Sequence, residues 1–222
     1  TGGSRGIGKA VAYALAEDGF IPVINYVKNR EMAEKTASET GGIAFMADVS
    51  DSGQVMQMIK EIHDRTGQID VLVNNAGISV SGLFTDITPQ QAQRLWNINV
   101  QGVFNCTKAV LPHMIHRKYG RIINISSMWG QVGASCEVHY SASKAAVIGF
   151  TKALAKEVGL SGINVNCIAP GVIDTDMNAC YSEDVMQELR DETPLGRTGK
   201  PEDIAQAVSF LASGKSDFIT GQ

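Results

Sequence analysis

Short apolar segments rich in β-branched residues alternate with segments of helical periodicity along nearly the whole chain. The segment 69–74 is largely apolar, which is typical of a strand buried on both faces of a parallel sheet. In 6–18, apolar residues recur at three- and four-residue spacing, which predicts a helix. This alternation predicts an α/β fold with a doubly wound parallel sheet and helices on both faces. The expected strands are 21–26, 43–47, 69–74, 121–126 and 163–168, and the expected helices are 6–18, 31–40, 52–65, 89–114, 138–158, 183–190 and 201–212.

We expect one domain, 1–222, because the chain contains no internal repeat, low-complexity tract or linker. A glycine-rich loop begins at Thr1 with no apolar strand before it, and residues 218–222 resemble the lead-in to a further strand. We therefore expect the first and last strands of the sheet to be missing, so that the chain is a fragment at both ends. A sheet that lacks its first strand is expected to leave a gap in the core.

Charge and cysteine usage disfavour several classes of function. The net charge is −4 and spread along the chain, which argues against duplex DNA and anionic membranes as partners. No apolar run approaches the roughly 20 residues that span a bilayer. The four cysteines, at 106, 136, 167 and 180, have neither C-x-x-C nor zinc-like spacing. We expect no metal site, and small buried or semi-buried thiols in a reducing compartment, the cytoplasm.

The loop at 1–8 reads Thr-Gly-Gly-Ser-Arg-Gly-Ile-Gly and lies directly before a predicted helix. Glycines allow the backbone to approach a pyrophosphate closely, and the helix N-terminus offers free N–H groups and a positive dipole end. A glycine-rich turn alone is a weak signal, but its place at the start of an α/β alternation favours a Rossmann-type dinucleotide site. The loop lacks the Gly-Lys-Ser/Thr ending of a P-loop.

The end of the next strand predicts which dinucleotide is bound. An NAD site usually has an acidic residue there, about 20 residues after the loop, for the ribose 2′-hydroxyl. This chain instead has the sequence NYVKNR at 25–30, and Arg5 adds another cation within the loop. A 2′-phosphate suits these cations, so NADP(H) is favoured over NAD(H). The alternative is that Lys28 and Arg30 merely solvate the start of a helix.

Polar and small residues end two further strands. Asp48 and Val49 follow the strand at 43–47, where a carboxylate could accept a hydrogen bond from an adenine amino group. The sequence Asn-Asn-Ala-Gly at 74–77 ends the next strand, where small residues would let a cofactor lie against the backbone. Ligands bind at the carboxyl edge of such sheets, so we assign both segments to the cofactor site.

Tyr140 and Lys144 are four residues apart on a predicted helix and therefore share one of its faces. An ammonium ~4 Å from a phenol, at an effective dielectric of ~20, would favour the phenolate by roughly 4 kcal/mol, or up to about 3 pKa units. Such a tyrosine could exchange protons near neutral pH, and Ser127 could hold a substrate oxygen. A Tyr-x-x-x-Lys pair alone is more often a surface pair, and the other motifs decide against that reading.

Together these motifs resemble those of the short-chain dehydrogenase/reductase family, over nearly the whole chain. Within the family, the chain is similar to the 3-oxoacyl-[acyl-carrier-protein] reductases of fatty acid synthesis, through INVNCIAPGVIDTDM at 163–177 and Pro-Leu-Gly-Arg at 194–197. The matching motifs are Thr1 to Gly8, Asp48-Val49, Asn74 to Gly77, Asn99, Ser127, Tyr140-x-x-x-Lys144 and Pro170-Gly171-Val172-Ile173-x-Thr175.

The resemblance implies a catalytic role for four residues. Tyr140 would donate a proton to the carbonyl oxygen, Lys144 would lower the pKa of Tyr140 and bind the nicotinamide ribose, and Ser127 would orient the carbonyl. Asn99 would hold a water that links Lys144 to solvent; it is chosen over Asn97 because the family spacing N-x-x-G fits only Asn99. The implied cofactor-binding residues are Gly2, Ser4, Arg5, Gly6, Ile7, Gly8, Tyr26, Lys28, Asp48, Val49, Asn75, Ala76, Gly77, Tyr140, Lys144, Pro170, Gly171, Ile173 and Thr175.

The activity implied by the resemblance is NADPH-dependent reduction of a 3-oxoacyl thioester, carried by acyl carrier protein or CoA, to the 3-hydroxyacyl thioester. A basic run at 116–121 is expected on the carboxyl-edge rim, where it could dock an acidic carrier, although Ser161 stands where the subgroup often has an arginine. The run could equally be a helix C-terminus that favours cations. The alternatives are a dehydrogenase of a sugar, a steroid or another alcohol, and a non-catalytic nucleotide sensor, which the complete catalytic set argues against.

The resemblance also implies a homotetramer whose subunit contact is formed by the helices at 89–114 and 138–158; the alternative is burial within one subunit. Residues 174–193 are expected to form a mobile cover over cofactor and substrate. Met177, Tyr181 and Met186 in this cover favour an apolar substrate chain. Trp129, which follows the Ser127 motif, could line the substrate pocket or belong to the core.

Overall fold

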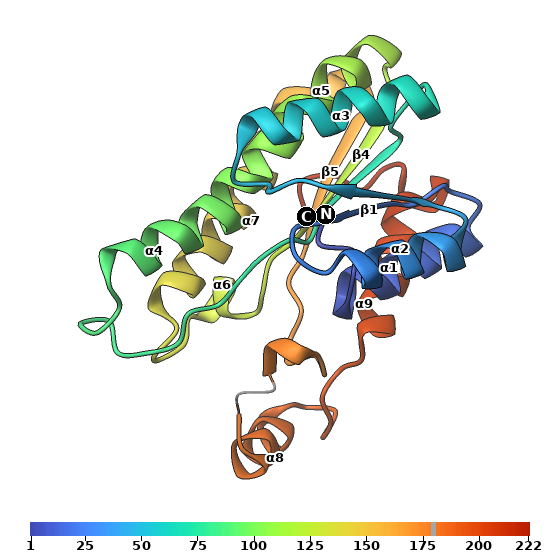
Figure 1. Ribbon diagram of the computed structural model, residues 1–222. Helices are drawn as coiled ribbons and strands as arrows, with labels where there is room; N and C mark the ends of the chain where they lie inside the picture. Colours follow the sequence, from blue (N-terminus) through green and yellow to red (C-terminus); the bar gives the residue numbers. More distant parts are fainter. Residues whose placement is uncertain (179–180) are drawn as a thin grey trace.

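Five parallel strands form the centre of the protein in this computed structural model, which describes residues 1–178 and 181–222 (Figure 1). Two strands pair with each other, and the other three form a second group in the order β3-β4-β5. The predicted α/β fold with parallel strands and helices on both faces is confirmed. The strands are β1 (Val23–Tyr26), β2 (Ile43–Met46), β3 (Val71–Asn74), β4 (Gly120–Ile125) and β5 (Ile163–Ile168).

Helices connect the strands in sequence, as parallel pairing requires. Short 3₁₀ turns lie at Gly159–Ser161, Asp176–Asn178 and Gly214–Ser216. The α-helices of the described residues are α1 (Gly6–Glu17), α2 (Arg30–Thr40), α3 (Ser52–Thr66), α4 (Pro89–Trp96), α5 (Gly102–Arg117), α6 (Trp129–Val132), α7 (Val138–Val158), α8 (Glu183–Glu192) and α9 (Pro201–Ala212).

The helix expected over 89–114 is divided into two. α4 begins with a capping box between Thr88 and Gln91 and has Pro89 at its start, as the sequence predicts. A π-helical turn, Asn97–Gln101, then separates α4 from α5. Periodicity did not reveal this turn, because a single widened turn leaves the helical pattern nearly intact. The four-residue α6 was not predicted either.

The central strand β4 is buried on both faces. Ile122 packs into a core with α3, α5 and α7, opposite Leu72 of β3 and Val165 of β5. Ile123 and Ile125 pack into a second core with α1 and α9. Side chains alternate across a strand, so the two cores lie on opposite sides of the sheet, as the ribbon shows (Figure 1).

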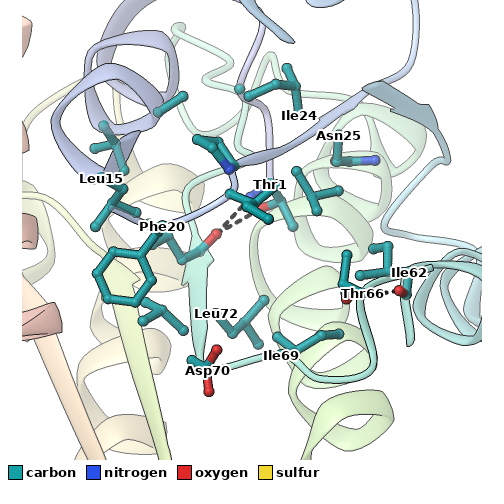
Figure 2. Close-up of a pocket in the computed structure, with 18 of the residues that line it drawn as sticks. Thr1, Leu15, Phe20, Ile24, Asn25, Ile62, Thr66, Ile69, Asp70 and Leu72 are labelled. Carbon is teal, nitrogen blue, oxygen red and sulfur yellow. Dashed lines mark hydrogen bonds between the residues drawn. The ribbon is translucent and has the colours of Figure 1, made fainter. Parts of the chain in front are cut away.

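No ladder joins β1 to β3, so the described strands form a sheet in two parts. A cavity of about 340 Å³ lies between the two parts (Figure 2). Its lining is mostly apolar and includes Leu15 of α1, Ile24 of β1, Ile62 of α3 and Leu72 of β3. The gap in the core that we expected from the sequence is therefore present.

The first residues bridge the carboxyl ends of β1 and β3. The backbone nitrogen of Thr1 donates to the carbonyl oxygen of Val73 at 2.6 Å, and the Gly3 N–H donates to the carbonyl oxygen of Asn25 at 3.0 Å. These bonds fix the glycine-rich loop at the edge where the two strands end.

The last residues run beside β5. The Gly221 N–H donates to the carbonyl oxygen of Val165 at 2.8 Å, and the Cys167 N–H donates to that of Gln222 at 2.7 Å. The lead-in predicted at 218–222 is thus paired with β5, although it forms no strand of its own.

Candidate active site

The glycine-rich loop folds tightly onto the start of α1. Gly2 and Gly6 have φ angles of 63° and 52°, a left-handed conformation that favours glycine. A Cβ on Gly8 would lie 2.2 Å from the carbonyl oxygen of Gly2. Arg5, the N-cap residue of α1, makes no side-chain capping bond, so the first N–H groups of the helix point into the loop without a side-chain cap. Such a helix N-terminus fits the pyrophosphate of a dinucleotide.

Asn75 and Thr1 join this loop to the end of β3. The Asn75 amide donates to the carbonyl oxygens of Thr1 and Gly2, at 3.0 and 3.1 Å. The Thr1 hydroxyl oxygen accepts from the backbone N–H groups of Asn75 and Ala76, at 3.1 and 3.0 Å. Hydrogen bonds therefore join the glycine-rich loop and the segment 74–77, both of which the sequence assigned to the cofactor site.

The three predicted cations are arranged differently from one another. Arg30, the first residue of α2, forms an exposed ion pair with Glu34 one helical turn away, at 2.7 Å. Arg5 lies on the loop and pairs with Asp176 at 3.3 Å in an exposed position. Lys28 is exposed just after β1. Arg5 and Lys28 are thus the cations that border the edge where β1 ends.

Asp48 and Val49 lie after β2, at the same edge. The Asp48 carboxylate accepts from the backbone N–H and the hydroxyl of Ser50, at 2.9 and 2.6 Å, so its own loop orients it. Val49 is buried against Gly102, where a Cβ would lie 2.7 Å from the Val49 side chain. Tyr26 is buried at the end of β1.

Asn99 points inward from the π-turn and is 1% exposed. Its Oδ1 accepts from the Ile78 N–H at 2.9 Å. Its Nδ2 donates to the Ile78 carbonyl oxygen at 2.9 Å and to Oγ of Ser143 at 3.1 Å. Asn97, in contrast, is exposed, and its side-chain oxygen accepts from the side chain of Gln93. The structure thus places Asn99, and not Asn97, beside α7.

Lys144 and Asn99 meet at Gly77, at the end of the segment that follows β3. A Cβ on Gly77 would lie 3.3 Å from Oδ1 of Asn99 and 3.4 Å from Nζ of Lys144. Nζ donates to the carbonyl oxygen of Ile125 at 2.9 Å. Burial lowers the pKa of Lys144 to about 8, so the side chain is still mostly protonated at neutral pH.

Tyr140 lies one turn before Lys144 on α7, with the Lys144 ammonium 5.6 Å from the centroid of its ring. Burial raises the pKa of Tyr140 to about 12; the Ser127 side chain acts to lower it, and Glu137 and Tyr181 act to raise it. The expectation that Lys144 brings this pKa toward neutrality is wrong for this structure. The main reason is burial, which disfavours the phenolate; the Lys144 ammonium lies 5.6 Å from the ring centroid and donates to the Ile125 carbonyl oxygen.

Ser127 follows β4 and is buried, with Oγ accepting from the Trp129 N–H at 3.2 Å. The neighbouring Met128 N–H donates to the carbonyl oxygen of Pro170 at 2.8 Å. This bond ties the Ser127 loop to Pro170 and Gly171, which follow β5. The predicted site residues that follow β4 and β5 therefore lie close together.

The segment after β5 returns to the glycine-rich loop. Ile173 is buried and forms an isolated parallel bridge with Gly199. A Cβ on Gly6 would lie 3.4 Å from the Thr175 side chain. The cover expected over 174–193 contains a 3₁₀ turn and α8, and its residues 179–180 lie outside the described residues.

Sequence reasoning missed two polar residues of the site. The Ser143 hydroxyl donates to the carbonyl oxygen of Tyr140 at 2.7 Å, and its oxygen accepts a hydrogen bond from the Asn99 side-chain amide. The Glu137 side chain is buried beside the start of α7. Ser143 could have been found from its helical spacing to Tyr140. Glu137 gave no signal, because an acidic residue at a helix start usually caps the helix in solvent.

The basic run at 116–121 does not flank the site within this chain. It ends α5 and begins β4, so it lies at the amino edge of the sheet, whereas the catalytic candidates follow the carboxyl ends of the strands. Across a strand of six residues the two edges are roughly 20 Å apart. Arg117 pairs with Asp70, and the buried Arg121 pairs with Asp217. Our expectation of a basic carboxyl-edge rim is therefore wrong, because a parallel strand always begins at the opposite edge.

The three described cysteines are free. Cys106 is buried and Cys167 is half-buried, as expected, but Cys136 is exposed, and Cys180 lies outside the described residues. Within the described part of the chain, no group of three or more His, Cys, Asp or Glu side chains is arranged to hold a metal ion. The described helices include none with the length and apolar character needed to cross a membrane.

A dinucleotide-dependent oxidoreductase is the class of protein that this sheet edge and its side chains define. Residues 2–222 match the family model described as enoyl-(acyl carrier protein) reductase. The chain belongs to the short-chain dehydrogenase/reductase family, as its motifs suggested.

Relatives with three different names are similar to this chain over its whole length. The 3-oxoacyl-[acyl-carrier-protein] reductase FabG of Staphylococcus aureus is 42% identical, and the match covers 100% of this chain and 92% of that protein. The acetoacetyl-CoA reductase of Paracoccus denitrificans is 45% identical, with the same coverage of 100% and 92%. The crystal structure of a gluconate 5-dehydrogenase from Burkholderia cenocepacia, in complex with NADP and tartrate, superposes with a TM-score of 0.95 at 37% identity and covers 100% of this chain and 89% of its own.

Proposed function

We propose that this protein reduces a 3-oxoacyl thioester, carried by acyl carrier protein or CoA, to the 3-hydroxyacyl thioester with NADPH, as a step of fatty acid synthesis. The observation that carries the proposal is that Ser127, Asn99 and the pair Tyr140 and Lys144 come from three segments to one place, beside the segment that Asn75 joins to the glycine-rich loop. Two similar proteins are named for reduction of 3-oxoacyl groups on a carrier protein or on CoA, which supports the substrate class.

NADPH is the cofactor that these residues fit. The uncapped N-terminus of α1 and the close approach of Gly8 to Gly2 form a cradle for a pyrophosphate. Arg5 and Lys28 supply positive charge for a 2′-phosphate, and a solved relative binds NADP. When bound, NADPH supplies the hydride for the carbonyl carbon.

Tyr140 and Ser127 act on the carbonyl oxygen in this proposal. Ser127 donates a hydrogen bond to that oxygen and holds it near the Tyr140 hydroxyl. As the oxygen becomes an alkoxide, the O–H bond of Tyr140 breaks and the proton moves to the alkoxide. A pKa of about 12 keeps Tyr140 protonated at neutral pH. It is still more acidic than water, with a pKa of about 15.7, so an alkoxide takes its proton readily.

In this proposal, Lys144 and Asn99 help to return a proton to the Tyr140 hydroxyl after the transfer. The ammonium of Lys144 lies 5.6 Å from the centroid of the Tyr140 ring, where we propose that it faces the phenolate that remains after transfer. Asn99 joins this pair to the segment after β3 through Ile78 and to α7 through Ser143. We assign to Asn99 the position of a water that connects Lys144 with solvent.

Replacing Tyr140 with Phe tests the proton-transfer role. We expect the variant to lose a factor of about 10²–10⁴ in turnover of acetoacetyl-CoA while its Kd for NADPH stays within about twofold. Turnover would be followed by NADPH absorbance and binding by NADPH fluorescence. Retained turnover would refute the role of Tyr140, and a protein that binds NADPH but reduces no ketone would be the nucleotide sensor that we argue against.

A second candidate is an alcohol dehydrogenase acting on a sugar acid or another ketone. The structural similarity to a gluconate 5-dehydrogenase favours it. The wild-type protein should be assayed with acetoacetyl-CoA and NADPH beside 5-ketogluconate, other sugars and steroids. Turnover of one of these, without turnover of the thioester, would replace the thioester proposal.

We also propose that the protein is a homotetramer. Both helices leave apolar side chains at the surface: on α5, Phe104 is 38% exposed and Ile115 is 44% exposed, and on α7, Val138 is 46% exposed. The ring of Phe104 contacts that of Phe150, with centroids 4.6 Å apart, so the two helices form one apolar face. Light scattering after gel filtration measures the mass directly, and a monomer at micromolar concentration would refute the tetramer.

A further inference from the structure

Glu137 is a buried carboxylate whose polar contacts are all with one neighbouring segment. It is 6% exposed. Oε2 accepts from the Ser79 hydroxyl at 2.6 Å, and Oε1 accepts from the Ser81 hydroxyl. Among the described residues, no lysine, arginine or histidine forms an ion pair with it. A buried charge usually has a cationic partner, so two hydroxyl donors in its place require an explanation.

The position of Glu137 at the start of α7 explains how the charge can remain buried. It is the N-cap residue of a helix of 21 residues, where the positive end of the dipole stabilises an anion. Cys136, just before it, has a φ of 61°, which is uncommon for a residue other than glycine. This conformation directs the Cys136 carbonyl oxygen to the Gly82 N–H at 2.9 Å. Side-chain and backbone bonds therefore hold the start of α7 to the same segment.

That segment, 78–82, follows the cofactor motif at the end of β3 and is held at both ends. The Asn99 side chain forms hydrogen bonds with both the backbone N–H and the carbonyl oxygen of Ile78. Glu137 binds Ser79 and Ser81. The segment thus runs from Lys144 and Asn99 to the start of the helix that carries Tyr140.

Glu137 also acts electrostatically on Tyr140, three residues further along the helix. Residues three apart lie on the same side of a helix. Burial is the main cause of the raised pKa of Tyr140; Ser127 after β4 acts to lower this pKa, and Glu137 on α7 and Tyr181 from the cover act to raise it. The Lys144 ammonium lies 5.6 Å from the centroid of the ring. Glu137 therefore adds to the effect of burial and disfavours the phenolate.

We propose that Glu137 is a positioning and specificity-determining residue: it holds the segment 78–82 against the start of the helix that carries Tyr140, and its charge disfavours ketones that carry an anionic group next to the reacting carbonyl. This inference rests on the proposed role of Tyr140 as proton donor and adds a criterion for the substrate. A thioester is uncharged beside its 3-oxo group, whereas a free 3-oxo acid carries a carboxylate there. The expected preference for the uncharged compound is on the order of tenfold or more.

Glu137→Gln tests the charge. The probes are ethyl acetoacetate, which is neutral, and acetoacetate, which is anionic and has the same 3-oxo group. The variant should raise kcat/KM for acetoacetate relative to ethyl acetoacetate by about tenfold. The alkaline limb of the pH profile for ethyl acetoacetate should move to lower pH, because removal of a negative charge lowers the pKa of Tyr140. A selectivity ratio and a pH limb that both stay at the wild-type values would overturn the proposal.

A Ser79→Ala/Ser81→Ala double variant tests the tether, because it keeps the charge and removes the two hydroxyl donors. Hydrogen–deuterium exchange at residues 78–82 should become faster in this variant and in Glu137→Ala, and the pH limb of the serine variant should not move down. Glu157→Gln, an exposed residue of the same helix, is the matched control for both assays.

The exchange measurement needs no turnover, so it separates this proposal from the assignment of the substrate. Unchanged exchange at 78–82 in both tether variants would refute the positioning role whichever ketone is the natural substrate. Faster exchange together with no turnover of any ketone by the wild type would leave the tether established and would instead refute the proposed activity.

Discussion

Replacing Asn99 with Ala should destabilise the protein strongly, although the change removes only a small side chain. Asn99 is 1% exposed and makes three hydrogen bonds, two with the backbone of Ile78 and one with Ser143. Its loss leaves the N–H and the carbonyl oxygen of Ile78 without their partners. Each buried polar group left unsatisfied costs about 1–3 kcal/mol, so we expect the free energy of unfolding to fall by about 3–5 kcal/mol.

Thermal and urea unfolding, followed by circular dichroism, measures this loss. In a protein of this size, about 2–4 °C of Tm corresponds to each kcal/mol, so the Tm should fall by roughly 10 °C. Asn97→Ala is the matched control, because Asn97 belongs to the same π-turn but is exposed, and its side-chain oxygen accepts from the side chain of Gln93. The control should stay within about 0.5 kcal/mol of wild type. Equal stability of the two variants would show that the bonds to Ile78 do not hold this region together.

Three further substitutions test the glycine-rich loop, α7 and the buried lysine. Gly8→Ala should weaken NADPH binding at least about tenfold, because the new Cβ would lie 2.2 Å from the Gly2 carbonyl oxygen. Fluorescence titration measures the Kd, and an unchanged Kd would show that the pyrophosphate binds elsewhere. Gly149→Ala, at an exposed position of α7 with open space around it, should raise the free energy of unfolding by about 0.5–1 kcal/mol in urea. The pKa of Lys144 is about 8 in the folded protein against 10.5 when unperturbed, so unfolding takes up a proton between these values and stability should rise with pH across that window. In Lys144→Met, this rise of the free energy of unfolding with pH, which amounts to at most about 3 kcal/mol, should be absent. If the free energy of unfolding varied with pH in the same way in variant and wild type, the burial of the Lys144 charge would be contradicted.

The elements of the fold were predictable where their signals are local. The capping box at Thr88 and Gln91 started α4 as expected, and β5 has the predicted bounds, 163–168. The break between α4 and α5 was not predictable, because a single widened turn leaves the helical pattern nearly intact and the bond of Asn99 to Ile78 joins two segments that are separate in the sequence. Local periodicity contains no information about such a contact.

The candidate site was predictable as a set of residues but not in its electrostatics. The motifs named the residues that the structure gathers at the carboxyl edge, because parallel strands all end there. Spacing alone could not say that Lys144 would be buried and bonded to Ile125, nor that burial would govern the pKa of Tyr140. The basic run at 116–121 was misplaced for a related reason: composition does not tell at which edge a segment lies.

The π-turn imposes a strict limit on chain length between α4 and α5. Each residue of an α-helix advances the chain by 100° and 1.5 Å, so a deletion within 97–101 would rotate α4 by about 100° relative to α5. Leu95 of α4, which is fully buried in the protein, would then turn away from the interior. Insertions and deletions among homologues should therefore avoid 89–117 and fall in the connections between elements.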